Sequence, residues 1–112
     1  MNSLEHKILV HLKNRHRGAE NAITYKSLSV ELGIEPRHLR NIVSEMVKSG
    51  TAPLCSTSLD GYFFPINEDE LGHAQAEDLS RIKELAKKYR GRRHAWDKYL
   101  LEPIEVKQLQ LI

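Results

Sequence analysis

The sequence contains a single cysteine, Cys55, among 112 residues, so no disulfide can form within the chain. One cysteine is typical of proteins from a reducing compartment, and we expect a cytoplasmic protein. No apolar run approaches the roughly 18 residues that a membrane-spanning helix needs. The first residues also lack the apolar core of a secretory signal. We therefore expect neither secretion nor a membrane partner.

The sequence also lacks the short motifs on which common enzyme and metal sites are built. It has no Cys-x-x-Cys pair, no His-x-x-x-His pair, no glycine-rich phosphate loop and no Gly-x-Ser-x-Gly turn. His6, His11 and His16 recur every five residues, a step that turns about 140° around a helix rather than lining one face. We expect no catalytic residue, no metal site and no cofactor, and we interpret Cys55 as a buried structural thiol.

Neither positive nor negative charge dominates the chain, which carries 17 Lys/Arg and 15 Asp/Glu for a net charge of +2. Bulk charge alone therefore does not indicate nucleic-acid binding. Residues 1–66 hold the net positive charge, while in residues 67–112 acidic residues come first and basic residues follow. This order complements the dipole of a helix. A basic surface that contacts DNA or a protein is the alternative.

Two short helices and a strand are predicted in the first third of the chain. Apolar residues at helical spacing predict a helix over 4–12, with Ser3 as its N-cap. Residues 22–23 are predicted to form a short strand. Thr24 is expected to cap the next helix, which Gly33 ends in the left-handed conformation.

The best-defined helix begins at Pro36, which suits the first position of a helix, and stops at Gly50. Its apolar residues share one stripe: Leu39, Ile42, Val43, Met46 and Val47. Its polar residues share the opposite stripe: Arg37, Arg40, Asn41, Ser44 and Lys48. We therefore expect one face to pack and the other to face water. Two short strands, over 52–56 and 62–65, are predicted to follow as a β-ribbon.

A long helix is predicted after Asn67, which is expected to cap it with Glu70 in the capping-box position. Its apolar residues recur at three- and four-residue steps as far as Tyr89, and Gly91 is expected to interrupt it. Such a stripe has to be covered, and a second copy of the chain is the simplest candidate. We therefore predict a homodimer with contacts from Leu71, Leu79, Ile82, Tyr89 and Trp96. Residues 103–112 are compatible with a strand, an arm across a partner or a frayed end.

Taken together, residues 4–65 resemble the winged-helix subset of helix-turn-helix proteins. The resemblance rests on Ile23-Thr24, Leu32-Gly33-Ile34, the Arg37-x-x-Arg40-x-x-Val43 helix, and Cys55-Ser56 followed by Gly61-Tyr62-Phe63-Phe64-Pro65. The chain is similar to small winged-helix proteins of bacterial phages and mobile elements, whose roles are regulatory or replication-linked.

The resemblance implies an α+β, mainly α fold: a winged helix-turn-helix in the order helix, strand, helix, helix, strand, strand, then a long C-terminal helix. Residues 1–66 would form the winged-helix domain and residues 67–112 an oligomerisation extension. Residues 36–49 would be the recognition helix and residues 57–61 the wing. That wing contains one acid and no Lys or Arg, unlike wings that contact DNA phosphates.

The predicted function is non-catalytic, sequence-specific binding of double-stranded DNA in phage or bacterial transcription regulation or replication. Arginine can bond guanine O6 and N7 together, and asparagine can bond adenine N6 and N7. The predicted DNA-contacting residues are Arg37, His38, Arg40, Asn41, Ser44, Lys48, Lys26 and Tyr25. Two alternatives remain: a protein-interaction module on the same scaffold, and binding of single-stranded DNA or RNA. The polar stripe itself has a simpler interpretation, as the solvated side that every amphipathic surface helix has.

Overall fold

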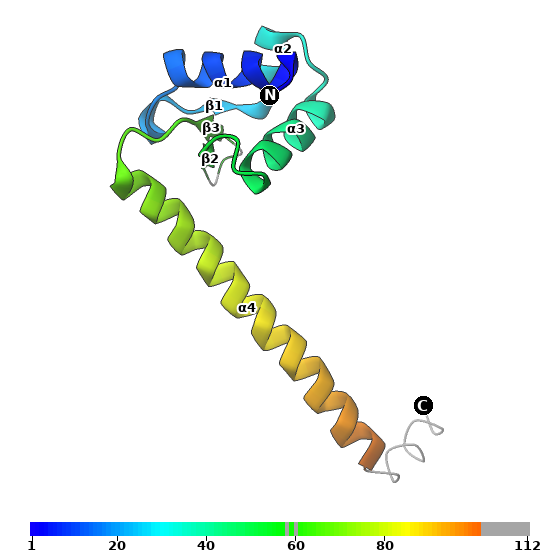
Figure 1. Cartoon of the computed structure of the whole chain (residues 1–112). Helices are drawn as coiled ribbons and strands as arrows, with labels where there is room; N and C mark the ends of the chain where they lie inside the picture. The colour runs from blue at the N-terminus through cyan, green and yellow to red at the C-terminus, as the bar shows by residue number, and fades with distance from the viewer. Residues whose placement is uncertain (58, 60, 102–112) are drawn as a thin grey trace. The chain divides into compact units, whose positions relative to one another are not determined.

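The computed structural model describes residues 1–57, 59 and 61–101, and it has an α+β fold that is mainly helical (Figure 1). The predicted order of helices and strands is confirmed, with one 3-10 turn, η1, added. The elements are α1 (Ser3–Arg15), η1 (Ala19–Asn21), β1 (Ile23–Thr24), α2 (Tyr25–Leu32), α3 (Pro36–Lys48), β2 (Cys55–Ser56), β3 (Gly61–Phe63) and α4 (Glu68–Leu101).

The described residues fall into two compact units, with the division between Gln75 and Ala76. The division lies inside α4, whereas the sequence-based division was placed at residue 66, just before this helix. The predicted roles for residues 103–112 lie outside the described residues. Among the residues that are described, no helix combines the length and the apolar character needed to cross a bilayer.

Three short antiparallel strands form the sheet, in the order β1-β3-β2. Ile23 of β1 lies opposite Tyr62 of β3, and Cys55 of β2 lies opposite Phe63. The predicted two-stranded ribbon therefore gains β1 as a third strand. Both ribbon strands are shorter than predicted; on the β2 side, Pro53 has no N–H to contribute to a ladder. Cys55 is buried, as predicted.

One hydrophobic core lies within residues 1–75, between the first three helices and the sheet. Its fully buried large side chains are Ile8, Leu12, Leu28, Leu39 and Met46. From α3, Val43 is also buried, and Ile42 packs against the core while staying half-buried. The prediction for Val47 is wrong, because its side chain is 46% exposed. At about 100° per residue, Val47 stands about 80° from Leu39, at the edge of the stripe.

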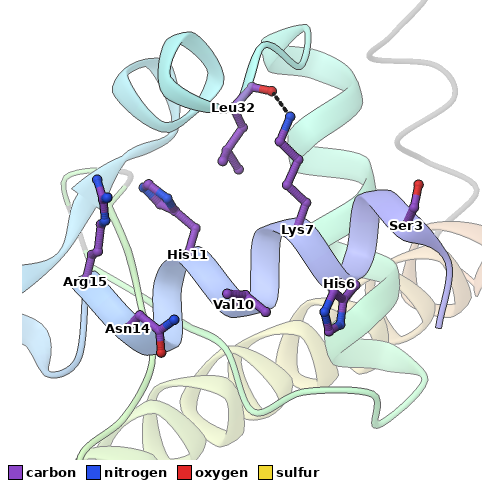
Figure 2. Close-up of a pocket in the computed structure, with 8 residues that line it drawn as sticks. All are labelled: Ser3, His6, Lys7, Val10, His11, Asn14, Arg15 and Leu32. Atoms are coloured by element: carbon purple, nitrogen blue, oxygen red, sulfur yellow. Dashed lines mark hydrogen bonds between the residues drawn. The ribbon is translucent and has the colours of Figure 1, made fainter.

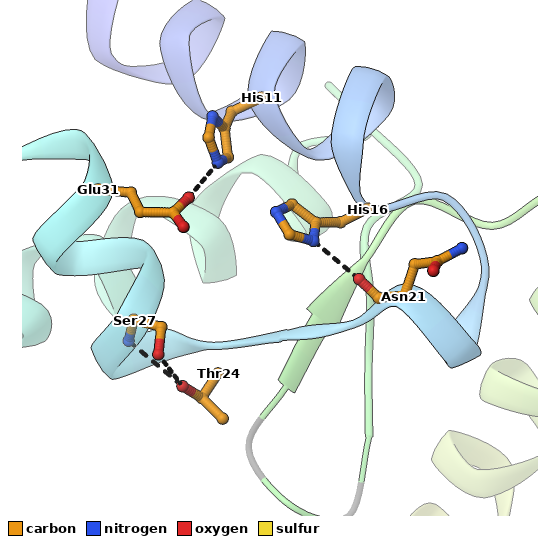
Figure 3. Close-up of polar contacts among 6 residues, drawn as sticks. All are labelled: His11, His16, Asn21, Thr24, Ser27 and Glu31. Carbon is orange, nitrogen blue, oxygen red and sulfur yellow. Dashed lines mark hydrogen bonds and ion pairs between the residues drawn. The ribbon is translucent and has the colours of Figure 1, made fainter.

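The ends of α2 agree with the sequence-based expectations. The Ser27 N–H donates to the Thr24 hydroxyl oxygen at 3.2 Å, and this hydroxyl donates to Ser27 Oγ at 3.0 Å (Figure 3). Gly33 follows with φ 66°, in the left-handed region that glycine adopts without a Cβ clash. A tight turn therefore leads directly from α2 to Pro36, the first residue of α3.

The first helix differs from its prediction at both ends. Asn2, not Ser3, is the N-cap, because Asn2 Oδ1 accepts the Glu5 N–H at 2.9 Å. Ser3 is instead the first helical residue. The helix also continues past residue 12 to Arg15. Polar residues 13–15 extend it because basic side chains near a helix C-terminus interact favourably with its dipole.

The last helix runs without a break from Glu68 to Leu101, so the predicted interruption at Gly91 is wrong. A glycine inside a helix costs only about 1 kcal/mol relative to alanine, and strong helix formers flank this one on both sides. The predicted cap is confirmed, because Asn67 Oδ1 accepts the Glu70 N–H at 3.0 Å. At 1.5 Å per residue the helix is about 51 Å long.

The Glu70 carboxylate holds the start of α4 against the loop after α1. It accepts the Ala19 N–H at 2.9 Å and the Ile66 N–H at 3.0 Å, rather than returning a bond to the cap residue Asn67. The Ala19 and Ile66 N–H groups lower the pKa of Glu70 from its usual value of 4.5. Since the folded state binds this proton more weakly than the unfolded state, the carboxylate stabilises the fold above pH 4.5.

We predict that Gly61→Ala destabilises the sheet. A Cβ at this position would lie 2.9 Å from Thr57 Oγ1 and 3.3 Å from Ala22 Cβ. The Thr57 hydroxyl is held in place, since it accepts the N–H groups of Leu59 and Gly61. Urea denaturation should give a loss of about 1–3 kcal/mol in unfolding free energy.

Gly72→Ala is the matched control, because no atom lies within 4 Å of the added Cβ. It should stabilise α4 by up to about 1 kcal/mol. Effects of equal sign and size for the two substitutions would contradict the close approach at Gly61.

We predict that Glu70→Gln lowers the urea midpoint at pH 7, because glutamine loses the charge and one of the two acceptor oxygens. The difference from wild type should shrink as the pH falls below 4.5 and through the folded-state pKa of Glu70, where the wild-type carboxylate is protonated. Glu68→Gln, in the same helical turn, controls for the helix dipole. A pH-independent difference for Glu70→Gln would contradict the stabilising role of its charge.

Candidate functional site

The polar face of α3 is open to solvent, while the opposite face of the same helix is buried in the core. The predicted DNA-contacting residues of α3 are exposed: Arg37, His38, Arg40, Asn41, Ser44 and Lys48. Lys26 of α2 is exposed as well, and Tyr25 is half-buried. The burial of the apolar stripe therefore sets which side chains α3 presents to the outside.

Five of the eight predicted residues gather around one surface pocket. Tyr25 comes from the start of α2, and Arg37, Arg40, Asn41 and Ser44 come from the first two turns and a half of α3. Pro36 and Glu35 complete the lining. The pocket thus brings two guanidinium groups, an amide, a hydroxyl and a carboxylate to one place on the surface.

Tyr25 orients one of these arginines. The Arg40 guanidinium carbon lies 4.9 Å from the centre of the Tyr25 ring, within the range of a cation–π contact. Tyr25 itself packs against the core. The guanidinium group is therefore held over a supported ring, and ordering it on binding a partner loses less side-chain entropy than ordering a free arginine.

Glu35 is a member of the pocket that the sequence analysis did not find. Its carboxylate caps α3 by accepting the His38 N–H at 2.9 Å and the Arg37 N–H at 3.1 Å. These backbone N–H groups, that of His38 foremost, lower the pKa of Glu35, so it is anionic at neutral pH. The available signal was its position just before Pro36, although Ser, Thr, Asp and Asn are the usual caps.

Lys48 lies in the last turn of α3, where its Nζ is 3.9 Å from a carboxylate oxygen of Glu45. Both side chains are more than two-thirds exposed. An exposed pair of this kind contributes about 0–1 kcal/mol, so it holds Lys48 only weakly.

The loop predicted as the wing, residues 57–61, is closed by Thr57. The Thr57 N–H donates to the Gly61 carbonyl at 2.8 Å, and the Thr57 hydroxyl accepts the Gly61 N–H at 3.1 Å. Leu59 is 82% exposed between them. Ser58 and Asp60 lie outside the described residues.

The residues predicted for a dimer contact are mostly exposed. Leu79, Ile82, Tyr89 and Trp96 are between 51% and 77% exposed. Leu71 is half-buried near the start of α4. The Trp96 and Tyr99 rings stack with their centres 6.1 Å apart.

No family model, curated protein or solved structure matches this chain. The resemblance to winged-helix proteins therefore rests on the residues quoted above. The positions and chemistry of the described side chains carry the functional inference.

A second group of polar side chains joins α1 to α2. His11 Nε2 lies 2.6 Å from Glu31 Oε2, and His16 Nδ1 lies 2.8 Å from the Asn21 carbonyl oxygen (Figure 3). The centres of the two imidazole rings are 5.3 Å apart. Spacing along the sequence missed this group because Glu31 comes from a different helix and His16 lies at the non-helical C-cap of α1, with φ −131°.

His11 also borders a surface pocket that runs along α1 (Figure 2). Lys7 closes one side of this pocket, where its Nζ donates to the Leu32 carbonyl oxygen at 2.7 Å. That carbonyl belongs to the last residue of α2, where no N–H of the same helix is placed to donate to it. The Lys7 bond therefore ties α1 to the C-terminal end of α2.

Proposed function

We propose that this protein binds double-stranded DNA without catalysis, with α3 as the recognition helix of a winged-helix domain. The cluster of Arg37, Arg40 and Asn41 on the solvent face of α3 is the observation that carries the proposal. A role in phage or bacterial transcription regulation or replication is proposed from the resemblance in sequence.

The chemistry of the pocket suits base edges in a major groove. Arg37 and Arg40 each offer a planar fork of donors that matches guanine O6 and N7, and the Asn41 amide matches adenine N6 and N7. All three lie in the N-terminal half of α3, the part of a recognition helix that meets base edges. The contact of Arg40 with Tyr25 supports this role by holding the guanidinium group in advance.

Phosphate contacts fall to lysines outside the pocket. Lys48 lies at the far end of α3, and Lys26 lies in the first turn of α2. The anionic Glu35 offsets part of the arginine charge in the pocket, so these lysines would supply most of the non-specific attraction. Binding through phosphates weakens with salt because each contact releases condensed counterions.

We propose a homodimer formed by α4, as a parallel coiled coil. Between Leu79 and Leu100, positions on one face of the helix recur at alternating steps of three and four residues. These positions are Leu79, Ile82, Ala86, Tyr89, Arg93, Trp96 and Leu100. This is the heptad spacing of a coiled-coil seam. No described residue of α4 is buried, so the seam is available to a second copy. Leu71 lies before the repeat begins.

Flanking charges favour the parallel arrangement. Leu79, Ala86 and Arg93 are the first seam positions of their heptads. In a parallel pair, the residue just before such a position faces the residue five places later in the other copy. Asp78 would face the partner's Lys83, and Arg92 would face the partner's Asp97. Both pairs are attractive. Arg93 inside the seam costs some stability and helps to fix the register.

The alternative function is a protein-interaction module on the same scaffold. The loop at 57–61 without a basic residue and the anionic Glu35 beside the arginines favour it. Both features reduce attraction to phosphates, whereas an acidic or mixed-charge protein surface would tolerate them.

We predict that the protein shifts mixed-sequence duplex DNA at low salt, and that the affinity falls with a log–log slope of about −0.9 per phosphate contact. On a duplex selected from random sequence, Arg40→Ala should weaken binding by about 1–3 kcal/mol, or about five- to 150-fold. Lys48→Ala should weaken binding to all sequences alike and lower the salt slope by about one contact.

Arg15→Ala removes an equal charge from an exposed site at the end of α1 and serves as the control. If Arg15→Ala and Arg40→Ala have the same effect, base recognition by α3 is ruled out. No binding to any nucleic acid at low salt would leave the protein-interaction alternative. A preference for single strands or RNA in the same titration would assign that other class.

We predict that replacing Leu79 and Ile82 together with glutamate converts the dimer to a monomer, because four carboxylates cannot be buried in one seam. Sedimentation equilibrium measures the change in mass. The control replaces Ser80 and Lys87, which lie outside the seam, with glutamate. A wild type that sediments as a monomer would refute the dimer.

A further inference from the structure

Three side chains with metal-binding donor atoms converge where α1 ends beside α2. His11 comes from the third turn of α1, His16 from its C-cap and Glu31 from the last turn of α2. One donor atom from each residue lies within 4.8 Å of the others. In Figure 3 the three side chains point toward a common centre.

The orientation of His16 suits a metal ligand. Its Nδ1 lies 2.8 Å from the Asn21 carbonyl oxygen, which can only accept, so Nδ1 carries the hydrogen. In the neutral ring the lone pair is then on Nε2. This atom is buried. Among the described residues, it is the one buried side-chain nitrogen or oxygen atom without a hydrogen-bond partner. Metal-bound histidines commonly donate their other N–H to a carbonyl in this way.

His11 and Glu31 provide the two other donors. Their 2.6 Å contact brings an imidazole nitrogen and a carboxylate oxygen to one point. The His11 side chain is only 14% exposed, whereas Glu31 is 46% exposed. His11 also borders the α1 pocket of Figure 2, which offers an ion a route from solvent.

We propose that His11, His16 and Glu31 bind one first-row divalent transition-metal ion, with Zn²⁺ as the representative. Imidazole and carboxylate ligands suit such ions, whereas Ca²⁺ and Mg²⁺ favour sites made of oxygen alone. Tetrahedral zinc with bonds of about 2.0–2.1 Å holds its donors about 3.3 Å apart. The His11–Glu31 contact would open by less than about 1 Å, and His16 would close in by rotation of its side chain. Water would take the fourth position.

An ion pair between His11 and Glu31 is the competing explanation for the group. It accounts for those two residues, but it leaves the buried His16 Nε2 without a partner. A metal ion satisfies all three donors at once. This site does not depend on the DNA-binding proposal, since none of its residues lines the α3 pocket.

The test is Zn²⁺ titration of the metal-free full-length chain by calorimetry. Wild type should bind one equivalent. His16→Asn keeps an amide N–H to donate to the Asn21 carbonyl oxygen but removes Nε2, and it should bind at least tenfold more weakly. Glu31→Gln should weaken binding as well. His6→Ala, on the same helix and beside the same pocket, should bind like wild type.

Thermal unfolding and Co²⁺ absorption give independent readouts. Zn²⁺ should raise the melting temperature of wild type and His6→Ala by more than that of Glu31→Gln, because a ligand of the folded state stabilises it in proportion to its affinity. Co²⁺ should give a visible band in wild type that Zn²⁺ displaces and that His16→Asn lacks. Absence of stoichiometric Zn²⁺ binding by wild type overturns the proposal. Equal losses for His6→Ala and His16→Asn overturn it too, because they indicate non-specific histidine binding.

Discussion

Burial of one stripe of α3 is the constraint on which the rest of this structure depends. Leu39 and Met46 are almost completely buried and Val43 nearly so. Burial of a large aliphatic side chain contributes about 1.5–3 kcal/mol, whereas an exposed ion pair such as Lys48–Glu45 contributes at most about 1 kcal/mol. The apolar side therefore fixes the rotation of α3 about its own axis. Rotation by one residue would bury Arg40 and expose Leu39, so the position of every polar group on the outer face follows from the core.

The order of elements could be predicted because its signals are local. Thr24, Gly33 and Pro36 each act within a few residues, through a cap, a left-handed turn and a fixed φ. Two of the errors arose where two local signals compete. Asn2 and Ser3 are both good caps, and the amide of Asn2 reaches the Glu5 N–H. Gly91 weakens a helix, but its neighbours on both sides are strong helix formers, so the helix continues.

The outer face of α3 was predictable from spacing alone, but its electrostatics were not. Glu35 enters the pocket because the chain turns at Gly33, and its carboxylate then reaches back to two backbone N–H groups. The contact of Arg40 with Tyr25 requires α2 and α3 to pack in one particular way. The group formed by His11, His16 and Glu31 is further removed from any sequence pattern. Its members come together through side-chain contacts between α1 and α2, such as that of His11 with Glu31. The five-residue interval alone predicts that the two histidines point in different directions around a helix.

The short helix α2 connects the two sites, since Tyr25 at its start contacts Arg40 and Glu31 near its end contacts His11. A bound metal ion would alter the proposed affinity for DNA only if it bound two arrangements of α2 differently. The donor atoms already lie within 4.8 Å of one another, so the proposed site needs no displacement of α2 as large as that distance. The Lys7 bond to the Leu32 carbonyl also fixes the end of α2 without metal. Metal binding would therefore stabilise the arrangement that presents Arg40, and would not switch between two arrangements.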